Sequence, residues 1–238
     1  MNEFKNGIKD SIPIALGYLA VSFSLGIAML AGGIHVFQGA LMSLTNVTSA
    51  GEFAGVKIII AGGTIAEMVL TQFIINIRYA LMSLSLSQKL SEKVKWWQRL
   101  IIAFANTDEI FAVAMAHQKK VTFSYMAGLQ IVPILGWTLG TILGNVAADL
   151  MPPAISQAMG VALYGMFIAI VIPEAKKTRP VAVVVGLAIL ISCILYYAPV
   201  FSFISDGIAI VISTVVAAGV GAFIFPVQLT DDFEEDTD

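Results

Sequence analysis

Several charged residues interrupt the most apolar stretches of this sequence. Glu52, Arg78 and the adjacent Asp108 and Glu109 all lie among aliphatic and aromatic residues. In the middle of a bilayer a carboxylate or guanidinium costs about 2.5–3.5 kcal/mol on insertion scales, so such groups must face protein or water. A guanidinium offers a planar fork to a carboxylate, whereas a carboxyl group can bind an ammonium group or carry a proton. These residue types predict either a binding site within the membrane or charges that brace the fold.

The polar residues around Arg78 share one face of a helix. Four of them follow one another at spacings of four, three and four: Gln72, Asn76, Tyr79 and Ser83. Such spacings stack side chains on one face, which is polar here and cannot point at lipid. Arg78 needs a negative partner, for which Glu52 and the Asp108–Glu109 pair are the candidates. The alternative is that its long side chain snorkels to the headgroups at the end of the helix.

The acidic pair follows two residues that favour helix starts. Asn106 and Thr107 suit an N-cap, which would place Asp108 and Glu109 in the first turn of a half-helix inside the membrane. The acids then either stabilise this helix start or bind a ligand or a proton. Glu52, in "SAGEFAG", has the same two interpretations, because the small residues around it allow close approach of a backbone or a ligand.

The composition indicates whether these segments lie in water or in a membrane. With 58% hydrophobic and 12% charged residues and a mean hydropathy of +0.88, the chain is too apolar for a soluble globule. We expect an all-α integral membrane protein, a polytopic helical bundle of six to eight segments, since each crossing needs roughly 20 residues. Residues 12–226 are expected to form a single transmembrane domain. A cytoplasmic N-terminus (1–11) would precede it, and an acidic, disordered cytoplasmic tail (227–238) would follow.

Two apolar segments, residues 36–55 and 100–116, contain polar interruptions. Irregular backbone survives at membrane depth only inside protein or beside a wet cavity, so both segments are predicted to be broken or re-entrant. If both are re-entrant, only Lys57 lies outside, and every basic cluster and both termini lie on the cytoplasmic side, as the positive-inside rule favours. We prefer this arrangement, with six full spans; seven and eight crossings are the alternatives.

The sequence also contains a weak internal repeat. "IPIALGYLAVSFSLG" is similar to "VPILGWTLGTILG", and each opens a long apolar span. The matching residues are Pro13, Gly17, Tyr18 and Gly26 in the first stretch and Pro133, Gly136, Trp137 and Gly144 in the second. Repeats in transporters place a binding site at their interface. Chance is the alternative explanation, because glycine and proline are common in membrane helices.

Other chemistries lack their motifs. The sequence has no histidine pair with metalloprotease spacing, no P-loop and no Gly-x-Ser-x-Gly elbow. We therefore expect no metal and no cofactor, and no nucleic acid as a partner. A membrane enzyme with Asp108 and Glu109 as general acid and base is an alternative, weakened by the missing nucleophile.

Three stretches resemble the signatures of a known family. "SAGEFAG" (49–55), "INIRYALMSLSL" (75–86) and "NTDEIFAVA" (106–114) are similar, in order and spacing, to those of the AzlC family, the large subunits of bacterial branched-chain amino acid exporters. The opening "GIKDSIPIALGYLAVSFSLGIAMLAGG" also resembles that family, and the resemblance covers about residues 7–226. Glu52 departs from the pattern, since glutamine is common at that position.

The resemblance implies a two-component permease, made of this chain and a small hydrophobic subunit of the AzlD type. It would export valine, leucine, isoleucine or methionine across the bacterial cytoplasmic membrane, driven by the proton motive force. A homo-oligomer of the complex is left open, and a channel-like pore is the main alternative. Residues expected to bind substrate or couple ions are Glu52, Gln72, Asn76, Arg78, Tyr79, Asp108 and Glu109. Residues expected to be structural are Pro13, Gly17, Tyr18, Gly51, Phe53 and Thr107.

The amino-acid substrate suggests a division of labour among these residues. A zwitterion needs a positive group for its carboxylate, an acid or a half-helix end for its ammonium group, and an apolar wall for its side chain. With this substrate, Arg78 would supply the first, and Asp108 or Glu109 the second.

Overall fold

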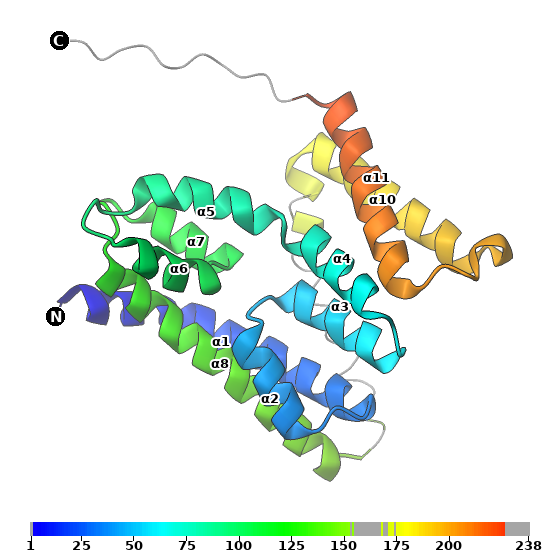
Figure 1. Ribbon diagram of the computed structural model, residues 1–238, viewed down its shortest axis with the longest axis horizontal. Coiled ribbons are helices and arrows are strands. Elements are labelled where there is room, and N and C mark those ends of the chain that lie inside the picture. Colours follow the sequence, from blue (N-terminus) through cyan, green and yellow to red (C-terminus); the bar gives the residue numbers. More distant parts are fainter. Residues whose placement is uncertain (1, 153, 155–167, 169–170, 174, 227–238) are drawn as a thin grey trace. The chain divides into compact units, whose positions relative to one another are not determined.

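A computed structural model describes residues 2–152, 154, 168, 171–173 and 175–226 (Figure 1). These residues form helices and one isolated bridge, which confirms the all-α class. Contacts divide the chain into unit 1, Met1–Ile168, and unit 2, Ala169–Asp238. The expected acidic tail and most of residues 157–173, which belong to the expected transmembrane domain, lie outside the described residues.

Unit 1 is built on two long helices that run parallel to each other, α1 (Asn2–Ala31) and α8 (Phe123–Leu150) (Figure 1). Gly7 of α1 lies against the start of α8 at Tyr125, and Gly26 lies against Thr141, so the two helices run in the same direction. Small residues make the approach close: a Cβ on Gly136 would lie 2.6 Å from the carbonyl oxygen of Ala15. The two similar sequence stretches therefore lie side by side. The helix α1 also extends into residues 2–11, which were expected to precede the first span.

This packing predicts a difference between two glycines. Gly144→Ala would drive a methyl group into the carbonyl of Phe23, whereas a Cβ on Gly17 meets nothing within 4 Å. Overpacking of this kind costs about 1–3 kcal/mol, while alanine at an open helix position gains up to about 1 kcal/mol. We expect Gly144→Ala to lower the melting temperature of the purified protein in detergent and Gly17→Ala to leave it unchanged or raise it. Equal melting temperatures would contradict the close packing of α1 and α8.

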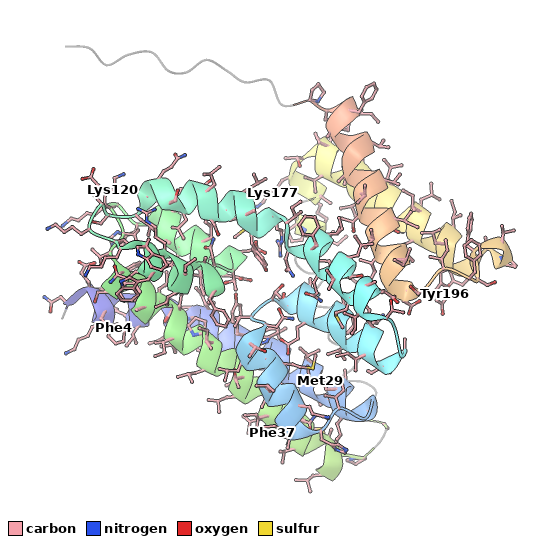
Figure 2. All side chains as sticks on the ribbon, viewed as in Figure 1. Phe4, Met29, Phe37, Lys120, Lys177 and Tyr196 are labelled. Atoms are coloured by element: carbon pink, nitrogen blue, oxygen red, sulfur yellow. The ribbon has the colours of Figure 1, made fainter. Side chains whose placement is uncertain are left out.

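The helices α2 (Val36–Thr45) and α3 (Ser49–Ile60) form a hairpin, here named hairpin A. Its base lies at the end of α1: Asn145 Nδ2 donates to the Ile34 carbonyl at 2.9 Å, and the Ile60 side chain packs on Gly32. The hairpin therefore starts and finishes at the same end of unit 1. The chain turns back between α2 and α3, near Trp137. This confirms that the first interrupted segment is broken and supports the re-entrant arrangement. Met29 of α1 is buried and packs on Gly39 of α2, whereas Phe37 of α2 is 78% exposed (Figure 2).

The helices α6 (Trp96–Phe104) and α7 (Asp108–Ala116) form hairpin B, which enters from the opposite end. At its base the Trp97 ring lies 5.8 Å from that of Phe123, and the His117 ring lies 4.5 Å from that of Tyr125. The second interrupted segment is therefore also broken, and it also returns to the end where it started. Hairpins A and B point their turns toward the middle of α1 and α8.

Between the hairpins, α4 (Ile65–Asn76) and α5 (Arg78–Lys89) form a pair bent by 42° at Ile77. This pair leads from the base of hairpin A to a bridge between Leu90 and Val121, beside the base of hairpin B. It therefore connects the two ends of unit 1. If the α4–α5 pair is the one segment that crosses the membrane between α1 and α8, these two helices run in the same direction, as observed. If one of the two hairpins also crossed, α1 and α8 would run in opposite directions, so that arrangement is excluded.

A glycine turn separates α3 from the α4–α5 pair. The helix α3 ends at Ile60, and Gly62 adopts a positive φ of 68°. Gly62 N–H donates to the Ile59 carbonyl and Gly63 N–H to the Ile58 carbonyl, the double bond of a Schellman cap. Gly33 (φ 82°) closes α1 with the same pattern. Both helices end in the sequence "AGG", which places glycine where only a residue without Cβ is unstrained.

Unit 2 contains α10 (Arg179–Tyr197), a short 3₁₀ turn η1 (Pro199–Phe201) and α11 (Asp206–Ile224). α10 and α11 pack against each other (Figure 1). In the described residues, four helices are long and apolar enough to span a membrane, namely α1, α8, α10 and α11, and the bent α4–α5 pair would make a fifth. The chain is therefore a multi-pass membrane bundle.

Candidate functional site

Three breaks in the helices of unit 1 meet at one place. These are the turn of hairpin A before Ser49, the bend at Ile77 and the turn of hairpin B before Asp108. Thr48 Oγ1 donates to Asn76 Oδ1 at 2.9 Å, joining the first two. Asn106 Nδ2 donates to Ser83 Oγ at 3.2 Å, joining the third to α5. The helices α3, α5 and α7 begin here, and α2, α4 and α6 end here, so positive and negative helix ends meet at this junction.

Arg78 stands at this junction and pairs with Asp108. Its Nη1 lies 2.5 Å from Asp108 Oδ2, and the two side chains are 48% and 47% exposed. The guanidinium carbon lies 4.9 Å from the centroid of the Tyr79 ring, and Nη2 donates to the Tyr79 hydroxyl at 3.4 Å. Arg78 therefore contacts the turn of hairpin B and does not snorkel along α5. Half exposure leaves the ion pair open to a ligand.

Glu109 belongs to a second group, centred on Tyr18 of α1. The Tyr18 hydroxyl lies 2.5 Å from Glu109 Oε2 and 2.6 Å from Thr107 Oγ1. Thr107 occupies the N-cap position of α7, as the sequence suggested, but its hydroxyl contacts Tyr18 and does not cap the helix. The two adjacent acids thus point to different partners, Asp108 to Arg78 and Glu109 to Tyr18. Neighbouring residues of a helix point about 100° apart, so the first turn of α7 can present the two acids to different partners.

Glu52 is fully buried, with 0% of its surface exposed, and it has neutral partners. Ser43 Oγ donates to Oε1 at 2.6 Å, and Trp137 Nε1 donates to Oε2 at 2.6 Å. The hydroxyls of Ser43 and Thr141 lie 2.7 Å apart, and either can be the donor. Glu52 therefore ties hairpin A to α8 and is not the partner of Arg78. Tyr18 and Trp137, which match in the two similar sequence stretches, form an edge-to-face pair with ring centroids 5.5 Å apart.

The polar face predicted around Arg78 is confirmed, and it contacts the turns of both hairpins. Gln72 Nε2 donates to the Gly51 carbonyl at 2.7 Å, and Asn76 Nδ2 donates to Gln72 Oε1 at 3.0 Å. Tyr79 donates to Thr48 Oγ1 at 3.3 Å. Gln72, Asn76 and Tyr79 therefore brace the turn of hairpin A, next to the ion pair.

The residues expected to be structural occupy varied places. Phe53 packs at the edge of a buried cluster that includes Trp137, and Lys57 Nζ lies 5.2 Å from its ring centroid. A Cβ on Gly51 would lie 2.8 Å from the side chain of Gln72, so this glycine permits the close approach of α4. Pro13 lies inside α1.

Sequence reasoning left several residues out of the site. Thr48 and Asn106 precede the two half-helices, and Ser43 and Trp137 hold Glu52. Asn106 is only 4% exposed, and its Oδ1 has no hydrogen-bond partner among the described residues. The signal was present in "NVT" and "NT", two short polar runs with the same residue types before both half-helices.

A model of the AzlC protein family matches residues 13–151, which include every residue of this junction. This chain belongs to the AzlC family. Among curated proteins, the inner membrane protein YgaZ of Escherichia coli strain K12 is 24% identical over 191 residues, which cover 77% of this chain and 78% of YgaZ. A membrane protein of Archaeoglobus fulgidus is 26% identical over 188 residues, covering 78% and 82% of the two chains. No solved structure matches.

Proposed function

We propose that this AzlC-family chain is the large subunit of a secondary transporter that exports valine, leucine, isoleucine and methionine. The observation that carries the proposal is the half-exposed Arg78–Asp108 pair at the point where the three helix breaks of unit 1 meet. The class of substrate comes from the resemblance to amino acid exporters. A zwitterionic head group fits the charges of this junction.

An amino acid would bind by taking over an ion pair that already exists. Its carboxylate replaces Asp108 in the fork of Arg78, and its ammonium group contacts the released Asp108. Asn106 Oδ1, which is buried and has no hydrogen-bond partner among the described residues, is a further acceptor for the ammonium group. In the empty protein the two charges neutralise each other, so neither is left unpaired in the bilayer.

Glu52 is the residue that we assign to proton coupling. Its contacts suit a carboxyl group that changes its protonation state, because the neighbouring hydroxyls can rotate. With the carboxylate, Ser43 donates to Glu52; with the acid, Glu52 donates to Ser43, which then donates to Thr141. Thr141 can in turn donate to the Trp137 carbonyl at 3.2 Å. Every hydroxyl and carboxyl proton in this row of hydrogen bonds therefore has an acceptor, whether Glu52 is ionised or protonated.

The distribution of charge supports the proposed orientation in a bacterial cytoplasmic membrane. Residues 89–99 and 119–120 contribute six basic side chains to the end of unit 1 where α1 and α8 begin. The positive-inside rule favours this end as the cytoplasmic one, with the N-terminus inside. A small AzlD-like subunit would complete the permease.

A channel-like pore is the second candidate. Two half-helical hairpins that enter from opposite ends and meet at their turns are a geometry that also suits a selective pore. A pore would give a flux that rises linearly with concentration and ignores the proton gradient, whereas a transporter saturates.

The proposal is tested by efflux of radiolabelled leucine, valine and methionine from preloaded cells. We compare cells that express the chain alone, the chain with a small AzlD-like subunit, and neither. Saturable efflux that requires the pair of subunits supports the proposal. Efflux equal to that of cells with neither subunit, for all three amino acids, would overturn it.

A further inference from the structure

A cavity at the basic end of unit 1 lies outside the site described so far. It has a volume of about 240 Å³ and is formed by the last turns of α5 and by α6. Its walls are largely apolar and include Leu86, Leu90, Leu100 and Ile102, of which Leu86 and Ile102 are each 2% exposed. Ser87 and Arg99 supply the polar part of the lining. A pocket that joins an aliphatic wall to one cation suits an amphiphilic anion.

Arg99 has no counter-ion in the described part of the chain. Its guanidinium forms neither an ion pair nor a side-chain hydrogen bond there, although the residue is partly buried. Lys120, at the same end of unit 1, does have a partner: its Nζ donates to the Gln88 carbonyl at 2.7 Å (Figure 2). A partly buried guanidinium without an acid favours an external anion, and its planar fork matches a phosphate.

The surroundings of the cavity place it at the level of lipid headgroups. Trp96 and Trp97, one turn before Arg99, are 75% and 42% exposed, and tryptophan concentrates at the membrane interface. The two loops at this end are tied together by hydrogen bonds between Ser91 and Val121 (2.8 Å) and between Val121 and Lys89 (3.0 Å). These loops and the adjoining turns of α5 and α6 carry one acid, Glu92, and six basic residues: Lys89, Lys93, Lys95, Arg99, Lys119 and Lys120.

We propose that this cavity binds one anionic phospholipid, with the phosphate on Arg99 and Ser87 and the start of an acyl chain along Leu86, Leu90, Leu100 and Ile102. The positive charge of the loops repels cationic ligands and attracts an anionic headgroup. Anionic lipids are present in the cytoplasmic leaflet. The apolar walls require an attached hydrocarbon chain, which distinguishes a lipid from free phosphate. The site is independent of the proposed transport substrate.

The cavity also touches the functional junction through α5. Ser83 lines the cavity and accepts the hydrogen bond of Asn106, two residues before Asp108. A lipid held here would therefore stabilise the arrangement of α5 against hairpin B.

The test measures the melting temperature of the purified full chain in detergent with phosphatidylglycerol, phosphatidylcholine or glycerol 3-phosphate. At a concentration about tenfold above the dissociation constant, phosphatidylglycerol should raise it by roughly 3–6 °C. The other two compounds should change it far less. Arg99→Gln should abolish the shift, whereas Lys95→Gln, which removes an exposed charge outside the cavity lining, should preserve it.

Ala103→Leu provides a second variant, because Ala103 lines the cavity and a larger side chain would fill it. This variant keeps Arg99 and should still lose the shift. Three results would overturn the proposal: an equal shift with phosphatidylcholine, an equal shift with glycerol 3-phosphate, or an unchanged shift in Arg99→Gln. Loss of the shift on addition of the small subunit would assign the cavity to that subunit and would also overturn it.

Discussion

Leucine efflux falls by roughly 10- to 150-fold when Arg78 is replaced by glutamine. The reason is the loss of charge-assisted hydrogen bonds to the substrate carboxylate, worth about 1.5–3 kcal/mol, with 1.4 kcal/mol for each factor of ten. Glutamine has a similar length, but it offers neither a charge nor a fork. Arg78→Lys keeps the charge and loses the fork, so we expect an intermediate loss. The measurement is the initial rate of efflux at equal abundance of the protein in the membrane.

The single substitution also leaves Asp108 without its partner, which could unfold the protein by itself. The double variant Arg78→Gln with Asp108→Asn removes both charges and should restore the abundance of the protein but not its transport. Arg179→Gln, an exposed arginine at the start of α10, is the matched control and should transport normally. Normal efflux in the double variant would show that the ion pair is structural.

Glu52→Gln is expected to separate transport from the proton gradient. Glutamine can accept a hydrogen bond from Trp137 and donate one to Ser43, so the fold is kept, but the side chain no longer changes its protonation state. Exchange of labelled for unlabelled leucine should persist in proteoliposomes, while the part of net transport that a proton gradient drives should disappear. Gradient-driven transport at the wild-type level would contradict the role that we assign to Glu52.

Glu52→Leu checks the structural part of the same account. Leucine leaves Trp137 Nε1 buried without an acceptor, whereas Ser43 can turn to Thr141, 2.7 Å away. An orphaned buried donor costs about 1–3 kcal/mol, so Glu52→Leu should melt at a lower temperature than Glu52→Gln. Equal melting temperatures would mean that Glu52 does not hold hairpin A against α8.

Much of the site could be predicted from the spacing of polar residues. Gln72, Asn76, Tyr79 and Ser83 share a face because a helix repeats every 3.6 residues, and the break at Ile77 bends this face without dividing it. The breaks in hairpins A and B were also predictable, because runs of threonine, asparagine and acidic residues cannot lie against lipid. These inferences need local information alone.

The pairing of the charged residues could be identified only from the tertiary structure. Glu52 and Asp108 were equal candidates for Arg78, and nothing in their local sequence separates them. The choice follows from the parallel packing of α1 and α8, which puts Trp137 beside Glu52 and leaves the turn of hairpin B beside Arg78. The bend at Ile77 has no glycine or proline to announce it; it lies where Asn76 and Tyr79 bond with Thr48.

The most direct test of the central claim asks which groups of leucine the junction recognises. In proteoliposomes that contain the chain and its small subunit, exchange of labelled leucine is measured with three competitors: isoleucine, leucinol and 4-methylpentanoic acid. Leucinol lacks the carboxylate, and 4-methylpentanoic acid lacks the ammonium group. We predict strong competition by isoleucine and at least tenfold weaker competition by the other two, because each leaves Arg78 or Asp108 without a partner. Competition by leucinol as strong as that by isoleucine would contradict the claim that Arg78 binds the substrate carboxylate.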